Sequence, residues 1–401
     1  MEKKYLYFQP EYVSKFKCDG AKCNARCCKD WVIFIDKASY EKYPAEVQEK
    51  IKFNSERKSH FMVLDEKRFC PMLTENNLCC LQRDYGEDFL STTCATYPRY
   101  TFDFGNFFER SLTLSCPVAA EMILFEKEPM KFEFAEVPKK IHDNGGRINS
   151  IKIKVAEGLA ESMVETQIAM ISILQERTLT IDQRLIVLGF FLDKLQEIYL
   201  GEFTGENFYR LIATYESKEF LREQVPRMLR IFSFDSKKFI GQMLKLFENS
   251  YGKINLSSQR EFIDNVADVL EIKPDENNFI SGSKIAANYE RLADARKKFL
   301  EEYSTFLENL LINELFMNCY PWRYEKNLIK NYGVFVINYK IFELILFSAT
   351  QKNFTSKEDL LNLVDIISTQ NDHANYFTSK ILEQLKDVDD IFPLMESLLE
   401  P

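Results

Sequence analysis

The chain has 401 residues, and its 46% apolar composition can bury one large core or two smaller ones, which excludes a disordered or low-complexity protein. The formal net charge is −9, and it arises after residue 120: residues 1–120 carry 18 basic and 17 acidic side chains, and the remainder carries 34 and 44. Such an acidic chain is a poor candidate for binding nucleic acid through its phosphates, so no nucleic-acid partner is expected.

The first residues, Met1 to Val13, are charged and aromatic and lack the apolar stretch of a secretory signal. We therefore expect a cytoplasmic protein, in which disulfides are rare and cysteine thiolates remain available for metals or catalysis. The apolar runs Leu185–Leu192 and Val334–Phe347 fall short of the ~20 uncharged residues of a membrane helix. They predict buried core helices and no membrane partner.

Residues 1–128 are predicted to form a loop-rich cysteine module with a few short strands. Its expected elements, in chain order, are an extended lead-in at 5–16 that stops at Pro10, a strand at 31–36, a short helix at 37–51, extended segments at 61–64 and 100–108, and a helix from Pro117. A bound metal can hold such loops together where a large core is absent.

Residues 129–150 are polar, contain Gly145 and Gly146, and are predicted to be a linker. From Ile151 the apolar spacing is helical, and Thr180 with Gln183 predicts a capping box. Residues 151–401 are therefore expected to form an irregular helical domain that binds a substrate or partner, which makes the fold class mainly α. Further helices are expected at 206–232, 236–250, 258–270, 284–318, 325–350, 356–370 and 373–399.

Nine of the ten cysteines fall between Cys18 and Cys116. Their spacing, C-x4-C-x3-CC and then C-x8-CC followed by two single cysteines, contains no C-x2-C pair, and His60 is the one histidine near them. Zinc sites usually show such pairs, so the pattern favours iron: a [4Fe-4S] cluster would use four of these thiolates, with zinc as the alternative. Cys80 and Cys319 also suit small buried apolar positions.

Several familiar motifs are absent. The C-x3-C-x2-C signature of radical enzymes starts at Cys23 and Cys27 but fails at Asp30, and no G-x-G turn for a dinucleotide or methyl donor occurs. Thiol-disulfide exchange is not favoured because C-x-x-C is missing. From the residues alone, the module is a thiolate metal site, and a metal that only holds loops together is an open alternative.

The order of motifs resembles the flagellin lysine-N-methylase, or FliB, family. The motifs are F-x-C-x4-C-x3-CC-x2-W from Phe16, I-x-ID from Ile33, CPxL from Cys70, NLC from Asn77, TCATYPR from Thr93, ER-SL from Glu109 and SCPxAA from Ser115. A weaker similarity exists to YkgJ-type zinc- or iron-chelating domains. The resemblance covers the first 125 residues, and a fainter likeness runs from Asn313 through Phe316–Arg323 to about Thr350.

The resemblance implies transfer of a methyl group from S-adenosylmethionine to lysine ε-amines of flagellin by an enzyme that carries an iron-sulfur cluster. The second hypothesis is a non-catalytic iron- or zinc-binding module attached to a helical interaction domain. Of each adjacent cysteine pair, one member is expected at the cluster, since neighbouring side chains in extended chain point to opposite faces. The cysteines that match the family are Cys18, Cys23, Cys27, Cys28, Cys70, Cys79, Cys94 and Cys116, with Cys80 extra.

The matching motifs also suggest residues for the chemistry. Tyr97, Glu109 and Asp36 are candidate bases for the substrate amine, which must be neutral to attack. Arg99 is a candidate for the carboxylate of the donor, and Trp31 and Tyr100 are candidates for the face toward its sulfonium. Structural alternatives stay open: Tyr97 and Trp31 can simply pack, and Arg99 can pair with Glu109 or Asp36.

Overall fold

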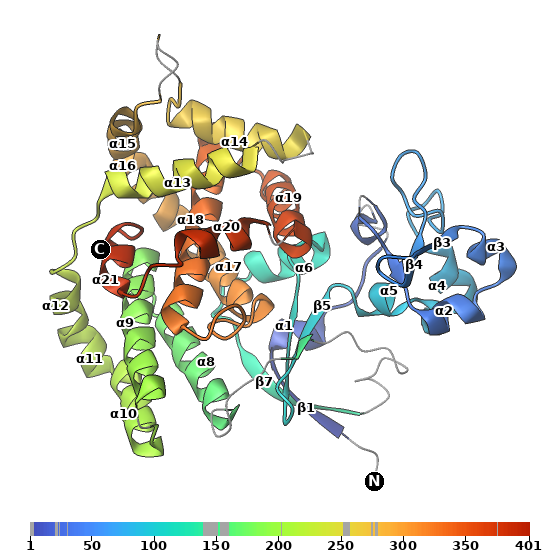
Figure 1. Ribbon diagram of the computed structural model, residues 1–401, viewed down its shortest axis with the longest axis horizontal. Helices are drawn as coiled ribbons and strands as arrows, with labels where there is room; N and C mark the ends of the chain where they lie inside the picture. The colour runs from blue at the N-terminus through green and yellow to red at the C-terminus, as the bar shows by residue number, and fades with distance from the viewer. Residues whose placement is uncertain are drawn as a thin grey trace. The chain divides into compact units, whose positions relative to one another are not determined.

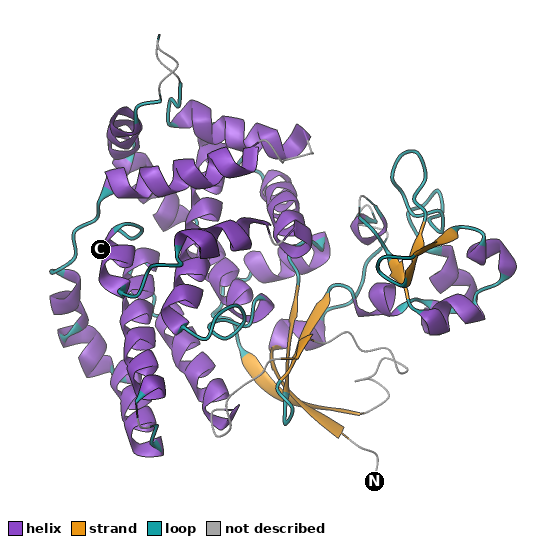
Figure 2. Cartoon of the chain, in the orientation of Figure 1, coloured by secondary structure: helices purple, strands orange, loops and turns teal. Residues whose placement is uncertain are grey.

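The computed structural model of the chain describes residues 4–20, 23, 25–29, 31–138, 151–152, 160–201, 203–251, 257–273, 276, 280–374 and 376–401. The chain divides into two compact units, Met1–Ile123 with Met130–Lys154 and Leu124–Pro129 with Val155–Pro401 (Figure 1). Figure 2 shows that the strands described belong to the first unit and that the second unit is helical. The predicted mainly α class with a strand-containing N-terminal module is thereby confirmed.

A mixed five-stranded sheet with the order β7-β1-β6-β5-β8 forms one part of the first unit. Strand β1 pairs antiparallel with β7 and parallel with β6, whereas β5 and β6 form an antiparallel hairpin. The hairpin confirms the extended chain expected at 100–108, and its turn uses Gly105 at a φ of 89°. The strands are β1 (Lys4–Pro10), β5 (Arg99–Asp103), β6 (Phe108–Leu112), β7 (Phe132–Pro138) and β8 (Ile151–Lys152).

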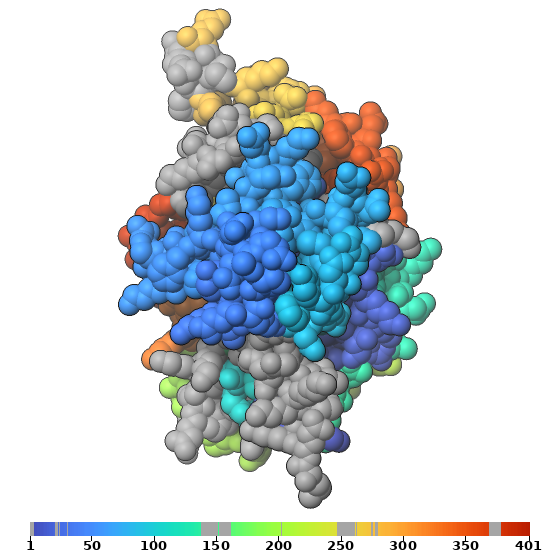
Figure 3. Space-filling view, turned by 90° about the vertical axis from the view of Figure 1, so that its right-hand side faces the viewer, coloured from blue at the N-terminus to red at the C-terminus, as the bar shows by residue number. Residues whose placement is uncertain are grey.

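A second, three-stranded sheet with the order β2-β4-β3 lies among short helices in the same unit. Its strands are β2 (Phe34–Ile35), β3 (Ile51–Asn54) and β4 (Ser59–Met62). The predicted strand at 31–36 is short because Asp36 already caps the next helix. The outer surface of this part, from blue to light blue, faces the viewer in Figure 3. The short helices of the unit are α1 (Glu11–Lys15), α2 (Lys37–Lys42), α3 (Ala45–Gln48), α4 (Cys80–Tyr85), α5 (Thr92–Thr96) and α6 (Pro117–Leu124), with 3-10 turns η1 (Arg26–Cys28) and η2 (Glu87–Phe89).

The second unit is an irregular bundle built around two long apolar helices, α9 (Ile181–Leu200) and α18 (Leu328–Gln351). The predicted capping box is present: the Thr180 side chain accepts from the Gln183 backbone, and the Gln183 side chain accepts from the Thr180 backbone. The remaining helices are α8 (Ala160–Leu174), α10 (Gly205–Glu216), α11 (Lys218–Glu223), α12 (Val225–Leu229), α13 (Ser236–Tyr251), α14 (Ser257–Val269), α15 (Gly282–Arg291), α16 (Ala293–Glu302), α17 (Ser304–Met317), α19 (Lys357–Ala374), α20 (Tyr376–Gln384) and α21 (Ile391–Glu396).

Helix α18 is long and apolar enough to cross a membrane by length and composition, but 89% of its most apolar window is buried inside the protein. Leu185–Leu192 in α9 and Val334–Phe347 in α18 are both buried, apart from a half-buried Asn338, as predicted for core helices. Close contact between helices requires glycine at one point of α9. A Cβ on Gly189 would lie 2.9 Å from the Tyr332 hydroxyl of α18.

Charged side chains are buried in the second unit, and each of them has an opposite partner. Lys340 of α18 donates to Asp182 of α9 and to Glu343, with Nζ to oxygen distances of 2.9–3.0 Å. Arg184 donates to Glu308, which is 1% exposed, at 2.8 Å. Pairing of this kind offsets the desolvation that buried charges would otherwise suffer.

The segment predicted as a linker, 129–150, contains strand β7 at Phe132–Pro138, and residues 139–150 lie outside the described residues. The compact units also assign Leu124–Pro129 to the helical unit rather than to the cysteine module. The predicted helices at 206–232 and 284–318 are each divided into three. The first division occurs where the Ser217 side chain caps α11 by accepting from the Phe220 backbone.

Candidate functional site

A cavity of about 570 Å³ lies within the first unit and is lined by side chains from loops, helices and strands that are distant in sequence. One wall comes from the loop between α1 and η1, a second from α4 and α5, and a third from the β5–β6 hairpin and the start of α6. Hydrogen bonds hold the loops in place: the Trp31 indole donates to the Cys27 carbonyl at 3.0 Å, and the Cys70 backbone donates to the Cys28 carbonyl at 2.7 Å.

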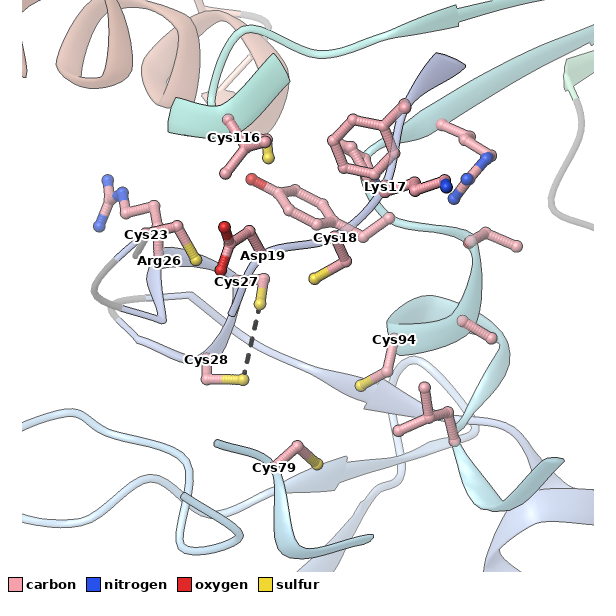
Figure 4. Close-up of a pocket in the computed structure, with 18 of the residues that line it drawn as sticks. Lys17, Cys18, Asp19, Cys23, Arg26, Cys27, Cys28, Cys79, Cys94 and Cys116 are labelled. Atoms are coloured by element: carbon pink, nitrogen blue, oxygen red, sulfur yellow. Dashed lines mark hydrogen bonds between the residues drawn. The ribbon is translucent and has the colours of Figure 1, made fainter. Parts of the chain in front are cut away.

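Seven of the eight cysteines predicted as metal ligands line this cavity. The eighth, Cys70, does not line it and belongs to the hydrophobic core cluster that includes Met62 and Leu81, although its thiol still interacts electrostatically with those of Cys27, Cys79 and Cys94. Figure 4 shows Cys116 just before α6 on one side, Cys79 and Cys94 on the opposite side, and Cys18, Cys27 and Cys28 between them. The seven are Cys18, Cys23, Cys27, Cys28, Cys79, Cys94 and Cys116.

The two adjacent pairs behave differently. Cys27 and Cys28 both line the cavity, with 3.7 Å between their sulfurs, because they lie in the 3-10 turn η1, where successive side chains are about 120° apart. The expected alternation of an extended segment does not apply there. At the second pair, Cys79 lines the cavity, and the Cys80 sulfur lies 3.9 Å from the Met72 sulfur and packs on the core.

The thiols of the cavity are difficult to ionise together. Burial, with a smaller contribution from neighbouring cysteines, raises the pKa of Cys94 and of Cys116 to about 12. For Cys116, hydrogen bonds from the backbones of Ala119 and Val118 at the start of α6 act in the opposite direction. A bound cation would reverse this balance, because thiolates coordinated to a metal remain deprotonated.

The chemistry of the donor set fits a soft metal. The histidine near the module, His60, does not line the cavity and stacks on Tyr40 with 3.9 Å between ring centroids, which leaves sulfur as the dominant donor. Sulfur donors suit an iron-sulfur cluster or a four-sulfur zinc site. Among the described residues, no group of three or more cysteine, histidine, aspartate or glutamate side chains is arranged to hold a single metal ion.

Three of the residues predicted for the chemistry line the cavity: Trp31, Tyr97 and Arg99. The rings of Trp31 and Tyr97 are 6.1 Å apart, and the Tyr97 hydroxyl lies 3.3 Å from the Ser115 hydroxyl. The Arg99 guanidinium lies over the Phe16 ring at 5.3 Å, and within the described part of the chain it has no ion pair with Glu109 or Asp36. The cavity therefore combines thiols, an aromatic wall and a guanidinium.

The other three predicted residues do not line the cavity. Tyr100 and Glu109 follow or precede the lining residues Arg99 and Arg110, so strand alternation directs their side chains to the opposite face of the sheet. Asp36 caps α2 by accepting from the Ser39 backbone at 2.9 Å, and it also accepts from the Thr92 backbone at 2.8 Å.

These hydrogen bonds make Asp36 a weak base. Burial acts to raise the pKa of Asp36, but the hydrogen bonds from Thr92 and Ser39 outweigh it, and the net shift is downward. A carboxylate whose lone pairs already hold two segments together is poorly suited to accept a proton from an amine. The geometry gives no support to the predicted roles of Asp36 and Glu109 as bases or of Tyr100 in donor binding.

Arg110 is a lining residue to which the motif comparison gave no role, although it is the arginine of the quoted ER-SL motif. Its side chain donates to the hydroxyls of Thr101 at 3.1 Å and Tyr7 at 2.7 Å. The signal that could have found it is the hairpin register, because Thr101 is paired with Arg110 and shares a face with Arg99.

Comparison with known proteins gives two kinds of match. A sequence model described as the FliB lysine N-methylase C-terminal domain matches residues 167–399, within the helical unit. The chain is 32% identical over 133 residues to the flagellar biosynthetic protein FliU of Salmonella muenchen, covering 30% of this chain and 79% of that protein. No solved structure matches the chain.

Two relatives carry the name lysine-N-methylase. The chain is 31% identical over 135 residues to the protein of this name in Salmonella typhimurium, and equally so to that of Salmonella choleraesuis. In both cases the match covers 30% of this chain and 33% of the relative. The chain thus matches about a third of the length of these two proteins.

Proposed function

We propose, from the premise that this chain belongs to the FliB lysine N-methylase family, that it transfers methyl groups to lysine ε-amines of a protein substrate. One observation carries the proposal: seven cysteines that match the family line a single cavity together with Trp31, Tyr97 and Arg99. At about 570 Å³ the cavity has the size of a small-molecule site rather than of a metal site alone.

S-adenosylmethionine is the methyl donor in this proposal. The lysine nitrogen forms a bond to the methyl carbon with its lone pair as the carbon-sulfur bond breaks, and S-adenosylhomocysteine leaves with the electrons of that bond. Trp31 and Tyr97 supply ring faces near which a sulfonium is stabilised by cation-π attraction. The donor would therefore lie with its sulfonium on the aromatic side of the cavity.

The lysine must lose a proton before it attacks, because its ordinary pKa is ~10.4. Removal from water lowers the pKa of an amine, and a hydroxyl in the cavity can orient the neutral form. Tyr97 fits this positioning role, because it lines the cavity and its hydroxyl is 3.3 Å from the Ser115 hydroxyl. The proton leaves to water.

Four of the cavity cysteines would hold an iron-sulfur cluster, with a four-sulfur zinc site as the alternative. A bound cluster would fix the loops that build the walls, as structural metals do in small domains with few elements of their own. The positions of Cys79 and Cys116 at the starts of α4 and α6 add backbone N–H groups that stabilise thiolates.

Flagellin is the substrate proposed here. Its support is the name of one relative, a flagellar biosynthetic protein, together with the family name. The acidic helical unit is a suitable surface for a lysine-bearing protein, since opposite charge accelerates encounter.

The test is incubation of the anaerobically prepared chain with purified flagellin and isotopically labelled S-adenosylmethionine, followed by peptide mass spectrometry. The proposal predicts label on flagellin lysines. Tyr97→Phe should reduce kcat by about 100-fold if the hydroxyl orients the amine, while Tyr100→Phe, on the other face of the sheet, should leave kcat unchanged. Donor binding without label on any lysine would contradict the methyltransferase assignment.

A further inference from the structure

Two arginines of the first unit point into the cysteine cavity from neighbouring strands. Arg99 and Thr101 are two residues apart in β5, so their side chains lie on the same face of the sheet. Thr101 is paired with Arg110 across the β5–β6 hairpin. Arg99 and Arg110 are therefore diagonal neighbours on the same face of the sheet, within reach of one small ligand group. Both line the cavity.

Neither guanidinium has a carboxylate partner among the described residues. Arg110 donates to two neutral hydroxyls, of Thr101 and Tyr7, and stacks on the Tyr7 ring at 4.2 Å. Arg99 has a ring contact with Phe16, and Glu87, Cys18 and Cys116 act on it through longer-range electrostatics.

Buried arginines of the second unit differ from Arg99 and Arg110 because they form ion pairs with carboxylates. In the second unit Arg184 forms an ion pair with Glu308 at 2.8 Å, and Arg296 forms one with Glu400 at 2.8 Å. In the cysteine cavity two half-buried cations lie near each other instead. Burial lowers the pKa of both Arg99 and Arg110, and the proximity of Arg99 lowers that of Arg110 further.

We infer that Arg99 and Arg110 form a carboxylate-binding subsite, which takes the α-carboxylate of the amino-acid half of the methyl donor. The guanidinium fork matches a carboxylate bidentately, and a carboxylate would neutralise both cations at once. Asp19 and Glu87 line the same cavity and suit the neighbouring α-ammonium group. This inference rests on the proposed function, and it adds Arg110 and the chemistry of the contact.

A donor without the carboxylate provides the test. The full chain, prepared anaerobically, is titrated calorimetrically with S-adenosylmethionine and with decarboxylated S-adenosylmethionine, which lacks that one group. We expect the intact donor to bind at least about 10-fold more tightly, as charge-assisted hydrogen bonds imply. Arg99→Gln and Arg110→Gln should each remove about this factor for the intact donor and leave the affinity for the decarboxylated donor unchanged.

Lys52→Gln is the matched control, since it removes one positive charge from an exposed residue of the same unit that does not line the cavity. It should change neither affinity by more than about 2-fold, because exposed charges are screened. Thermal melting of the unliganded Arg99→Gln variant should show no loss of stability, which distinguishes a ligand-binding arginine from a structural one.

The outcomes separate the two proposals. Equal affinity of the wild-type chain for both donors, or arginine variants that bind the intact donor normally, would overturn the carboxylate subsite and leave methyl transfer intact. If the wild-type chain binds neither donor, the proposed function itself fails. Weakened binding of both donors by an arginine variant would assign that arginine to the folding of the cavity and would also overturn the subsite.

Discussion

The adjacent residues Cys79 and Cys80 have separate surroundings although both are cysteines at the start of α4. Cys79 lines the cavity and is close to the backbone N–H groups of Leu81 and Gln82, whereas Cys80 packs against Met72 and the hydrophobic core. The difference follows from the start of the helix, which turns one side chain toward the cavity and its neighbour toward the core.

This difference predicts opposite results for two single substitutions. Cys79→Ala should lose most of the metal bound by the chain, because it removes a thiolate from the cavity wall. Cys80→Ala should retain the metal content of the wild type. Iron and zinc analysis of both variants after identical anaerobic purification makes the comparison, and equal loss in the two would show that the cavity does not select Cys79.

Asp36 illustrates a residue whose position explains stability rather than catalysis. Its hydrogen bonds hold its folded pKa below the unfolded value, so its stabilisation is complete above the unfolded pKa of ~3.9 and is lost as the pH falls through the folded pKa. Asp36→Ala should lower the free energy of unfolding at pH 7 by about 1–2 kcal/mol.

The pH dependence of that loss provides the check. Urea unfolding of wild type and Asp36→Ala should give curves that converge as the pH falls through the folded pKa of Asp36, where the wild-type carboxylate becomes protonated. Asp36→Asn keeps a capping oxygen and should lose less at pH 7. A difference between wild type and Asp36→Ala that stays constant down to low pH would contradict the role of the carboxylate charge.

Contact between α9 and α18 depends on the small size of Gly189. An added methyl group would crowd the Tyr332 hydroxyl, which is already fixed because it donates to the Leu185 carbonyl at 2.8 Å. Gly189→Ala should lower the free energy of unfolding by about 1–3 kcal/mol through overpacking. Gly241→Ala on the exposed side of α13, where nothing lies within 4 Å, should instead raise it by about 0.5–1 kcal/mol.

Thermal or urea unfolding of Gly189→Ala and Gly241→Ala tests this prediction, because their changes in the free energy of unfolding should have opposite signs. A destabilised Gly241→Ala or an unchanged Gly189→Ala would show that the helices are not in close contact at this point.

The buried charges of α9 and α18 also depend on one another for their stability. Lys340→Met leaves Asp182 and Glu343 without their cation, and it should lower the free energy of unfolding by about 3–5 kcal/mol. Adding Asp182→Asn and Glu343→Gln should recover part of the loss, because no uncompensated charge remains. Urea unfolding of the single and triple variants measures this, and a further loss in the triple variant would contradict the pairing.

The sequence predicted the ends of helices and strands where a particular type of residue defines them. The capping box of Thr180 and the strand end at Pro10 are visible as residue types with a defined backbone role. The breaks at Leu292 and Tyr303, which divide 284–318 into α15, α16 and α17, involve residues that form no side-chain cap. Those helices end because of tertiary packing, which no local pattern contains.

The cavity could be predicted only in part, for a similar reason. Motif order indicated eight cysteines together with Trp31, Tyr97 and Arg99, and all of these except Cys70 line it. It did not distinguish these from Tyr100 and Glu109, because sequence neighbours in a strand lie on opposite faces and the register of the hairpin must be known first.

In the whole molecule, the cysteine cavity and the match to the family model belong to different units. The cysteine cavity is built entirely by residues of the first unit, and the family match at 167–399 lies in the helical unit. In the proposed function, the small unit would hold the donor and the metal, and the large unit would bind the substrate protein. Length and composition left one core or two open, and the cysteine motifs placed the metal and donor candidates in residues 1–128.

The most direct measurement is iron and acid-labile sulfide analysis of the anaerobically reconstituted chain, combined with calorimetric titration of S-adenosylmethionine before and after removal of the metal. We predict about four irons and four sulfides per chain, saturable donor binding, and loss of that binding when the metal is removed. Zinc without iron and sulfide, or a cluster in a chain that does not bind the donor, would contradict the account.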